Sequence, residues 1–380
     1  MRRGWKWCII SAVKDSKCSK IVTTLREEIL SGKYSRQFPS ERALMARFRV
    51  SRPTARQAVS SLCEQGLVVK RQGSGTFITK VGSSRKIGLI GPDVAQSEFF
   101  SRLVREVSAL AQKEGYTLLF GEIAAASAER RAAQAERLAR DFIVGGVSGV
   151  IFQPIQFTSD SELANARILS WFDAAAVPVV LCDYDFVAWP NRSRYDVVGS
   201  NNIDAGAMVV KYLVKLGAKR IHFLLSPYAA QSQCNRLRGV MLAAAEAKVA
   251  AASLVASPDD AVAIRRDFRR GRPDAFVCSN DNAAAVLKKT LERLGVSVPE
   301  DVMLVGFDDV MISTLTTPQL TTVRQECGLI AKAAFYRLLE RISNPNAERV
   351  ELLFPTTLVE RASTIAKHKT NLKKKGKHHA

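Results

Sequence analysis

The sequence is poor in the residues that bind metals or form disulfides. It contains seven cysteines and four histidines among 380 residues. The cysteines are scattered singly, without a Cys-x-x-Cys pair, and three of the histidines lie in the last thirteen residues. Zinc sites need clustered thiols and imidazoles, and disulfide-rich secreted domains need paired cysteines. We therefore expect no metal site and a reducing compartment, the cytoplasm.

Long hydrophobic runs and catalytic signatures are also missing. No stretch approaches the ~20 apolar residues that span a membrane, so we expect no membrane association. Lys6 interrupts the apolar run at the N-terminus, and no small-residue cleavage site follows, so we expect no signal peptide. The sequence holds no Walker loop, nucleophile elbow or paired carboxylates. We therefore expect no catalytic residues and no cofactor.

Positive charge is concentrated at the two ends of the chain, which has a net charge of +20. Residues 1–86 carry +14 and residues 367–380 carry +6, whereas the 31 basic and 31 acidic residues between them cancel. A small basic domain on a neutral body favours binding to a polyanion such as DNA. The alternative, a generally basic soluble protein, would have its charge spread evenly.

The first eighty residues show the pattern of three helices followed by two short strands. An apolar helical stripe ends at Gly32, a second helix begins at Ser40, and a third begins at Ser51 and ends at Gly66. Two short apolar runs then flank a glycine-rich turn. This order predicts a winged helix-turn-helix domain.

Beyond Lys86 the pattern changes to alternating strands and helices. Helices are predicted between strands, including 98–113 and 126–140, and the alanine-rich stretches 124–135 and 243–252 are interpreted as helical. The predicted strands lie at 87–90, 117–120, 147–152, 177–182, 220–225, 275–278 and 302–307. Such alternation predicts a doubly wound α/β domain with parallel sheets, and its length favours two lobes.

These patterns divide the chain into five segments. They are an N-terminal extension (1–16), a winged helix-turn-helix domain (17–78), a linker (79–85), a two-lobed α/β domain (86–365) and a basic tail (366–380).

Two arginines near the start of the third helix are placed to read DNA. Arg52 and Arg56 lie four residues apart on one face, beside the apolar stripe. The start of a recognition helix meets base edges in the major groove, and the guanidinium fork matches guanine O6 and N7. Arg42, in the first turn of the preceding helix, is placed for a phosphate contact.

The segment 17–78 resembles the GntR family of winged-helix repressors. The resemblance rests on the order Pro39-Ser40-Glu41-Arg42, Val50-Ser51-Arg52-x-Thr54-x-Arg56-x-Ala58, Gly66-Leu67-Val68 and Gly73-Ser74-Gly75-Thr76-Phe77. It departs from the family in lacking the glycine usual before the first motif and in having Pro53, which removes a backbone donor. The resemblance implies contacts to double-stranded operator DNA from Arg42, Ser51, Arg52, Thr54, Arg56, Gln72 and Gly73.

The segment 86–365 resembles the effector domain of lactose- and galactose-type repressors, which is related to periplasmic sugar-binding proteins. The resemblance rests on Arg236-Leu237-Arg238-Gly239, Ser279-Asn280-Asp281-Asn282, Val305-Gly306-Phe307-Asp308-Asp309 and Pro318-Gln319-Leu320-Thr321-Thr322-Val323-Arg324-Gln325. A GntR-type N-terminal domain on this body is the arrangement of the arabinose repressor type. The resemblance implies that a small-molecule effector contacts Asp183, Arg236, Asn280, Asp308 and Gln325.

The residue chemistry independently fits a sugar. Asp183, Asn280 and Asp308 each follow an apolar strand, and ligands of doubly wound sheets bind beyond the carboxyl ends of strands. Carboxylates, an amide and a guanidinium satisfy hydroxyl groups, while aromatic faces pack against the sugar ring. The candidate aromatics are Phe99, Phe100, Tyr184 and Trp189, although ordinary core or surface packing also explains them.

We therefore expect a homodimeric transcription regulator, a repressor, whose operator binding is modulated by a monosaccharide or oligosaccharide. A dimer presents two recognition helices to a roughly palindromic operator. Two alternatives remain open. A pyridoxal-phosphate-dependent body, found with some GntR-type domains, requires a lysine placed for a Schiff base. A transport binding protein would explain the body but not the winged helix.

Overall fold

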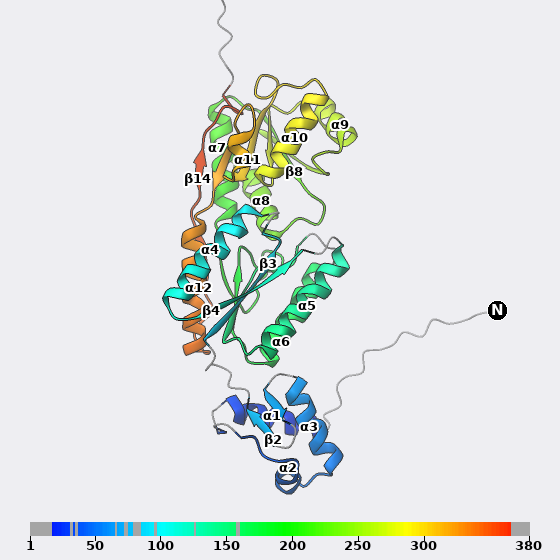
Figure 1. Ribbon diagram of the computed structural model, residues 1–380. Coiled ribbons are helices and arrows are strands. Elements are labelled where there is room, and N and C mark those ends of the chain that lie inside the picture. Colours follow the sequence, from blue (N-terminus) through cyan, green and yellow to red (C-terminus); the bar gives the residue numbers. More distant parts are fainter. Residues whose placement is uncertain are drawn as a thin grey trace, which may run out of the picture.

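The computed structural model describes residues 17–30, 33–34, 37–64, 67–71, 75–78, 85–94, 97–124, 127–156 and 160–365. We call the part within 17–78 the head and the part within 85–365 the body. Figure 1 shows the head at one end of the elongated molecule and the two lobes of the body stacked beyond it.

The head contains three helices and a two-stranded antiparallel sheet. The helices are α1 (Lys17–Leu30), α2 (Glu41–Phe48) and α3 (Arg52–Glu64), and the strands are β1 (Val68–Arg71) and β2 (Gly75–Ile78). The Ser40 hydroxyl caps α2 by accepting a hydrogen bond from the Ala43 amide. This order confirms the predicted winged helix-turn-helix fold.

The core of the head fixes which face of α3 is free. Ala55, Ala58, Val59 and Leu62 recur at helical spacing and are buried against α1, α2 and β1. The opposite face of α3 therefore remains exposed.

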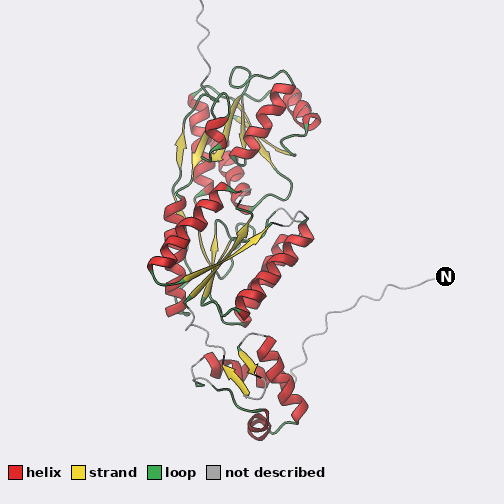
Figure 2. Cartoon of the chain, viewed as in Figure 1, coloured by secondary structure: helices red, strands yellow, loops and turns green. Residues whose placement is uncertain are grey.

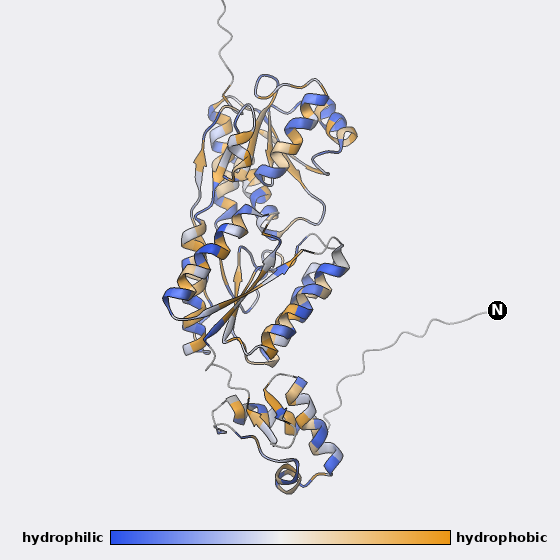
Figure 3. Ribbon diagram, in the orientation of Figure 1, coloured by the Kyte–Doolittle hydropathy of each residue, from blue (hydrophilic) through white to orange (hydrophobic). Residues whose placement is uncertain are grey.

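The lobe nearest the head, lobe 1, is a six-stranded parallel sheet with helices on both faces. Its strand order is β13-β7-β6-β5-β3-β4. The strands are β3 (Lys86–Pro92), β4 (Thr117–Ile123), β5 (Gly149–Phe152), β6 (Val179–Cys182), β7 (Asp196–Ser200) and β13 (Glu351–Phe354). The helices are α4 (Glu98–Lys113), α5 (Ala128–Val144), α6 (Ser161–Ala174) and α12 (Cys327–Ser343). Figure 3 shows alternating hydrophilic and hydrophobic bands along α5, as expected for a helix with one face on a sheet.

The far lobe, lobe 2, repeats this architecture, with strand order β14-β12-β11-β10-β8-β9. All its strand pairs are parallel except β12 with β14. The strands are β8 (Arg220–Leu225), β9 (Ala250–Val255), β10 (Ala275–Cys278), β11 (Met303–Asp308), β12 (Thr321–Arg324) and β14 (Thr357–Val359). The helices are α7 (Asn202–Lys215), α8 (Gln231–Glu246), α9 (Ala261–Gly271), α10 (Asp281–Arg293) and α11 (Ile312–Leu315). Figure 2 shows the strands of each lobe between helices, which confirms the two-lobed doubly wound fold.

The chain crosses between the lobes three times. The crossings follow β7, β12 and β13, because the next element in each case belongs to the other lobe. Two hydrogen bonds tie these crossings together: the Ser200 hydroxyl donates to Gln325 Oε1 at 2.7 Å, and the Asn201 amide donates to the Phe354 carbonyl at 2.8 Å. These three crossings, which we call the hinge, connect the two lobes.

The interpretation of 243–252 as helix is wrong at its C-terminal end. Helix α8 ends at Glu246, and residues from Ala250 form β9, paired in parallel with β8. The helix propensity of alanine is small, and the backbone hydrogen bonds of the sheet override it. The helix predicted at 126–140 forms as α5, two residues later at its start and four later at its end.

Within the described residues, no helix is long and apolar enough to cross a membrane. The same part of the chain contains no group of three or more metal-ligating side chains.

Candidate functional site

The exposed face of α3 carries the predicted DNA-reading arginines. Arg52 and Arg56 are exposed, and Arg42 is exposed in the first turn of α2. The Ser51 and Thr54 hydroxyls lie 3.0 Å apart at the start of α3. The structure therefore brings five of the seven predicted DNA-contacting residues to two adjacent helices of the head. Gln72 and Gly73 lie outside the described residues.

Glu41 connects the recognition helix to the wing. One of its carboxylate oxygens lies 3.8 Å from Arg52 Nε, and the other accepts a hydrogen bond from Lys70 Nζ at 3.2 Å. Arg52 stands at the start of α3 and Lys70 on β1, so a single carboxylate spans both elements. The Arg52 side chain is nevertheless 78% exposed and remains accessible to a ligand.

A cavity of about 420 Å³ lies between the two lobes of the body. All five residues that the sequence predicted for the effector line it: Asp183, Arg236, Asn280, Asp308 and Gln325. Asp183 follows β6 in lobe 1, whereas Asn280 and Asp308 stand at the ends of β10 and β11 in lobe 2. The cavity thus lies at the carboxyl ends of strands from both sheets, the usual place for ligands in doubly wound folds.

Arg236 connects several residues of the cavity wall on the lobe 2 side. Its guanidinium is buried, donates from Nε to Asn202 Oδ1 at 2.8 Å and from Nη1 to the Ser279 carbonyl at 2.6 Å, and lies 3.3 Å from Asp308 Oδ1. Gly239, one turn later on α8, makes this position possible, because a Cβ there would lie 1.9 Å from the Ile203 carbonyl oxygen on α7. The close helix crossing therefore fixes the arginine side chain in the cavity wall.

Gln325 links the hinge to the cavity. Its Nε2 donates to Asp308 Oδ1 at 2.6 Å while its Oε1 accepts from Ser200. Asn280 caps α10 by accepting from the Ala283 amide at 2.8 Å. These contacts hold the predicted side chains in defined orientations.

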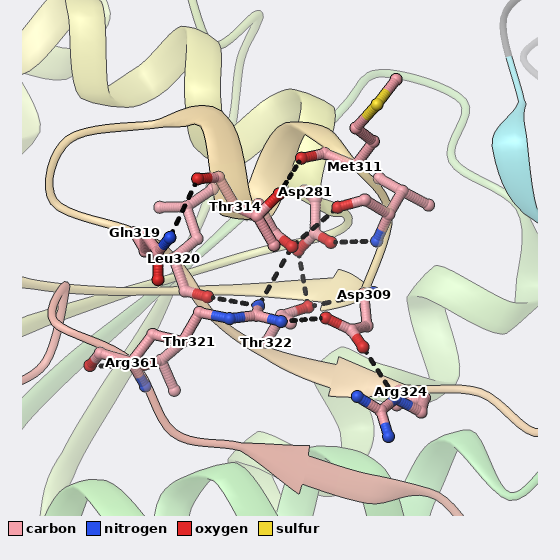
Figure 4. A network of polar contacts seen from close by, with 12 residues as sticks. Asp281, Asp309, Met311, Thr314, Gln319, Leu320, Thr321, Thr322, Arg324 and Arg361 are labelled. Carbon is pink, nitrogen blue, oxygen red and sulfur yellow. Dashed lines mark hydrogen bonds and ion pairs between the residues drawn. The ribbon is translucent and has the colours of Figure 1, made fainter.

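The turn after Asp308 is held by the network in Figure 4. Asp308 and Asp309 both have positive φ angles, 102° and 51°, a backbone conformation that non-glycine residues keep only where the surroundings enforce it. Asp281 accepts from the Val310 amide and the Thr322 hydroxyl. Burial, with the nearby Asp308 charge, raises the pKa of Asp281 to about 8 against the lowering effect of these two donors.

Asp309 anchors the other side of this turn. It accepts hydrogen bonds from Arg361 Nη2 at 2.5 Å and Arg324 Nε at 2.7 Å. Burial acts to raise the pKa of Asp309, but the two guanidinium groups outweigh it and lower the pKa below its ordinary value. The network thus fixes the turn that follows Asp308, and with it the position of the Asp308 carboxylate.

Asp183 is the centre of the lobe 1 side. Its φ is 77°, and a Cβ on Gly199 of the neighbouring strand would lie 2.3 Å from its carbonyl oxygen, so only glycine fits there. Burial raises the pKa of Asp183 to about 6; the Arg236 charge acts to lower it and the Asp308 charge to raise it. Asp183 Oδ2 accepts from Gln153 Nε2 and from the Ser232 hydroxyl, each at 3.3 Å. The contact with Ser232 joins the two lobes.

One of the four candidate aromatics reaches this cavity. Phe99 lines it, whereas Phe100 is buried in the lobe 1 core. Tyr184 donates to the Pro154 carbonyl, and it lines, with Trp189, a second cavity of about 60 Å³ on the other side of Asp183. The structure therefore leaves one aromatic ring to pack against a ligand in the main cavity.

Three buried polar residues of the cavity were missed from the sequence: Gln153, Ser232 and Gln233. Gln153 follows directly after β5, so the rule that identified Asp183 would have found it. Ser232 and Gln233 lie one turn before Arg236 on α8 and share its face, a spacing that could also have indicated them.

Comparisons with known proteins match the head and part of the body. Residues 17–78 match the family model of bacterial regulatory proteins, gntR family, and residues 210–364 match that of the periplasmic binding protein-like domain. The arabinose metabolism transcriptional repressor of Geobacillus stearothermophilus is 27% identical over 365 residues, which cover 90% of this chain and 96% of that protein.

Two solved structures share the fold of the body at lower identity. The transcriptional regulator CelR in complex with cellobiose is 21% identical, with a TM-score of 0.63, and the match covers 90% of this chain and 98% of CelR. A LacI family transcriptional regulator from Enterococcus faecium with bound ribose is 22% identical, with a TM-score of 0.59, and the match covers 73% of this chain and 98% of that protein.

Proposed function

Because this chain is a DNA-binding transcriptional regulator that joins a gntR-family helix-turn-helix domain to a periplasmic binding protein-like domain, we propose that it is a cytoplasmic repressor whose effector is a sugar. The observation that carries the proposal is the cavity between the lobes, lined by carboxylates, amides and a guanidinium. The relative that matches over nearly its whole length is a repressor, so the chain is a regulator and not an enzyme.

The head supplies the DNA contacts in this proposal. Arg52 and Arg56 read base edges in the major groove, Arg42 contacts phosphate, and Ser51 and Thr54 contact the backbone beside them. Gln72 and Gly73, which the sequence predicts in the turn of the wing, complete the set. The proposal assigns 17–78 to DNA binding, 79–85 to a linker and 86–365 to effector binding, with 1–16 and 366–380 as terminal segments.

In the body, Asp183, Arg236, Asn280, Asp308 and Gln325 hold the hydroxyl groups of the sugar. Carboxylates accept from vicinal hydroxyls, while the guanidinium and amides donate to them. Phe99 supplies the apolar contact for the ring. The two solved structures, which contain cellobiose and ribose, favour a sugar of one or two units.

Binding across two lobes explains the regulation. A ligand that contacts Asp183 in lobe 1 and Arg236 in lobe 2 stabilises one relative position of the lobes. It can shift DNA affinity only by the difference in its own affinity for the two states. We therefore infer that the sugar binds the DNA-free form more tightly and releases the operator.

We propose that the protein is a homodimer, and an outer strand of each sheet supports this. β4 and β9 are the outermost strands of their lobes, and they expose Phe120 and Val255, which are 37% and 59% exposed. Edges of this kind favour contact with a second copy. Sedimentation of the full chain tests the dimer.

A thermal-shift screen of the full chain against pentoses, hexoses and disaccharides tests the proposed function. One sugar is expected to raise the melting temperature and to lower affinity for operator DNA. The proposal is rejected if no sugar in the set does either.

A further inference from the structure

The residues that line the main cavity differ in how many of their hydrogen-bonding atoms have partners within the protein. On the lobe 2 side, Arg236 and Gln325 both contact Asp308, and Arg236 also donates to Asn202 and the Ser279 carbonyl, so these donors already have acceptors inside the protein. A ligand hydroxyl that needs a donor finds these groups partly engaged. The buried hydrogen-bonding atoms of the cavity that lack a partner belong to other residues.

Elsewhere in the cavity wall lie three buried acceptor atoms without a hydrogen-bond partner: Gln153 Oε1, Asp183 Oδ1 and Gln233 Oε1. We call these three residues the acceptor corner. Each residue is less than one-tenth exposed and lines the cavity. Gln153 and Asp183 belong to lobe 1 and Gln233 to lobe 2, so the corner spans the cleft.

The donors at this corner serve other atoms. Gln153 Nε2 and the Ser232 hydroxyl both approach Asp183 Oδ2, at 3.3 Å each, and leave Oδ1 without a donor. Because the Gln153 amide donates through its nitrogen, its oxygen is the atom left over. A buried acceptor without a donor is unfavourable, so the acceptor corner favours a ligand group that donates several hydrogen bonds.

The charges around the cavity favour a cation. Its wall contains the carboxylates of Asp93, Glu98, Asp183 and Asp308 against the guanidinium groups of Arg131 and Arg236. Glu98 is paired with Arg102, which stands outside the wall. The Asp183 carboxylate is the charged group of the acceptor corner itself.

A protonated primary amine matches these requirements better than a hydroxyl. It donates three hydrogen bonds, accepts none and carries a positive charge, whereas a hydroxyl donates one. We propose that the effector is an amino sugar whose ammonium group binds the acceptor corner of Gln153, Asp183 and Gln233. This inference rests on the proposed sugar-binding function and names the class of sugar.

Binding of such a ligand depends on pH through Asp183. Burial raises the pKa of this carboxyl to about 6. At pH 5 the Asp183 carboxyl is therefore protonated in most protein molecules, and it must lose this proton before it can pair with the ammonium group. Affinity for an amino sugar therefore rises between pH 5 and pH 7. A neutral sugar has no ammonium group to pair with the carboxylate and shows a smaller rise.

The test is calorimetry of the full chain with matched pairs of sugars that differ at one position. The pairs are D-glucose and D-glucosamine, D-galactose and D-galactosamine, and D-mannose and D-mannosamine. In at least one pair the amino sugar is expected to bind tenfold or more tightly than its neutral partner at pH 7. This preference should fall at least threefold at pH 5.

Two variants locate the effect. Asp183→Asn should abolish the preference for the amino sugar, and Gln233→Ala, on the other lobe, should reduce it about threefold. Asp141→Asn changes an exposed carboxylate on α5 and should leave the preference unchanged. Circular dichroism confirms that each variant is folded.

The outcomes separate this inference from the proposed function. Neutral sugars that bind as tightly as their amino partners, or more tightly, overturn the ammonium site but leave a sugar sensor. If no member of any pair binds while another neutral pentose or disaccharide does, the amino-sugar inference alone fails. If no sugar binds at all, both fail.

Discussion

The Ser200 hydroxyl donates a 2.7 Å hydrogen bond to Gln325 Oε1 across two of the three chain crossings between the lobes. This bond orients the Gln325 amide so that its nitrogen faces Asp308 Oδ1 at 2.6 Å. One residue thus contacts both the hinge and the ligand cavity. A movement of the crossings would therefore move Gln325 and change its contact with the Asp308 carboxylate in the cavity wall.

Ser200→Ala tests this link. The substitution leaves the buried Gln325 oxygen without its donor and releases the amide to rotate, so Asp308 loses a defined partner. We expect sugar affinity to fall about three- to tenfold while operator affinity without sugar stays unchanged. Calorimetry and fluorescence anisotropy measure the two affinities. Ser170→Ala, an exposed serine on α6, is the control, and equal behaviour of the two variants would contradict the link.

Substitutions in the head should separate base reading from phosphate binding. Arg52→Ala and Arg56→Ala are expected to remove operator preference, a loss of about 1–3 kcal/mol each, and to leave much of the non-specific affinity. Arg42→Ala should weaken binding to all DNA alike. Competition binding with operator and random duplexes measures the ratio of the affinities for operator and for random DNA. Arg265→Ala removes the same charge from exposed α9, and unchanged sequence preference in Arg52→Ala would reject the assigned role.

Operator affinity should fall steeply with salt. The net charge of +14 in residues 1–86 displaces counterions from DNA phosphates, and this gain shrinks as salt rises. Removal of residues 367–380, which carry +6, should change the slope little. If the salt dependence is lost when this segment is removed, the C-terminal lysines and not the head bind the DNA phosphates, which would contradict the account.

The stability of the sugar-free protein should depend on the ionisation of Asp183. Burial raises its pKa from an ordinary value of 3.8 to about 6, so the folded chain holds this proton more tightly than the unfolded chain. The contribution of this bound proton to the free energy of unfolding is present below about pH 4 and is lost as the pH rises through about 6. Asp183→Asn avoids the loss, which amounts to about 3 kcal/mol. Its melting temperature relative to the parent should rise between pH 5 and pH 7.5, whereas a constant difference would contradict the shift.

The fold was predictable from the sequence where apolar runs are continuous. β5, β6 and β10 are buried on both faces and produce short hydrophobic runs, and β8 and β11 do so with one interruption each, at His222 and Gly306. β9 and β13 were missed because they are partly exposed and their residues do not form a continuous buried run. Their conformation depends on pairing with β8 and β7, which no local pattern reveals.

The site was predictable where residues follow a strand. Asp183 and Asp308 were identified in this way, and the cavity brings them together. The sequence could not show that Gln153, Asp183 and Gln233 leave acceptor atoms unpaired, because that depends on which donors the two lobes bring near. The hinge contact between Ser200 and Gln325 joins residues 125 positions apart and was likewise invisible in the sequence.

The most direct test of the account compares operator binding of the parent and Arg236→Ala, with and without the sugar that most raises the melting temperature of the parent. Loss of the buried guanidinium leaves Asp308 and the sugar hydroxyls without their partner, so sugar affinity should fall tenfold or more. Fluorescence anisotropy should show that both proteins bind the operator alike and that the sugar releases only the parent. A variant that the sugar releases at the same concentration as the parent would contradict the claim that the cavity between the lobes controls DNA binding.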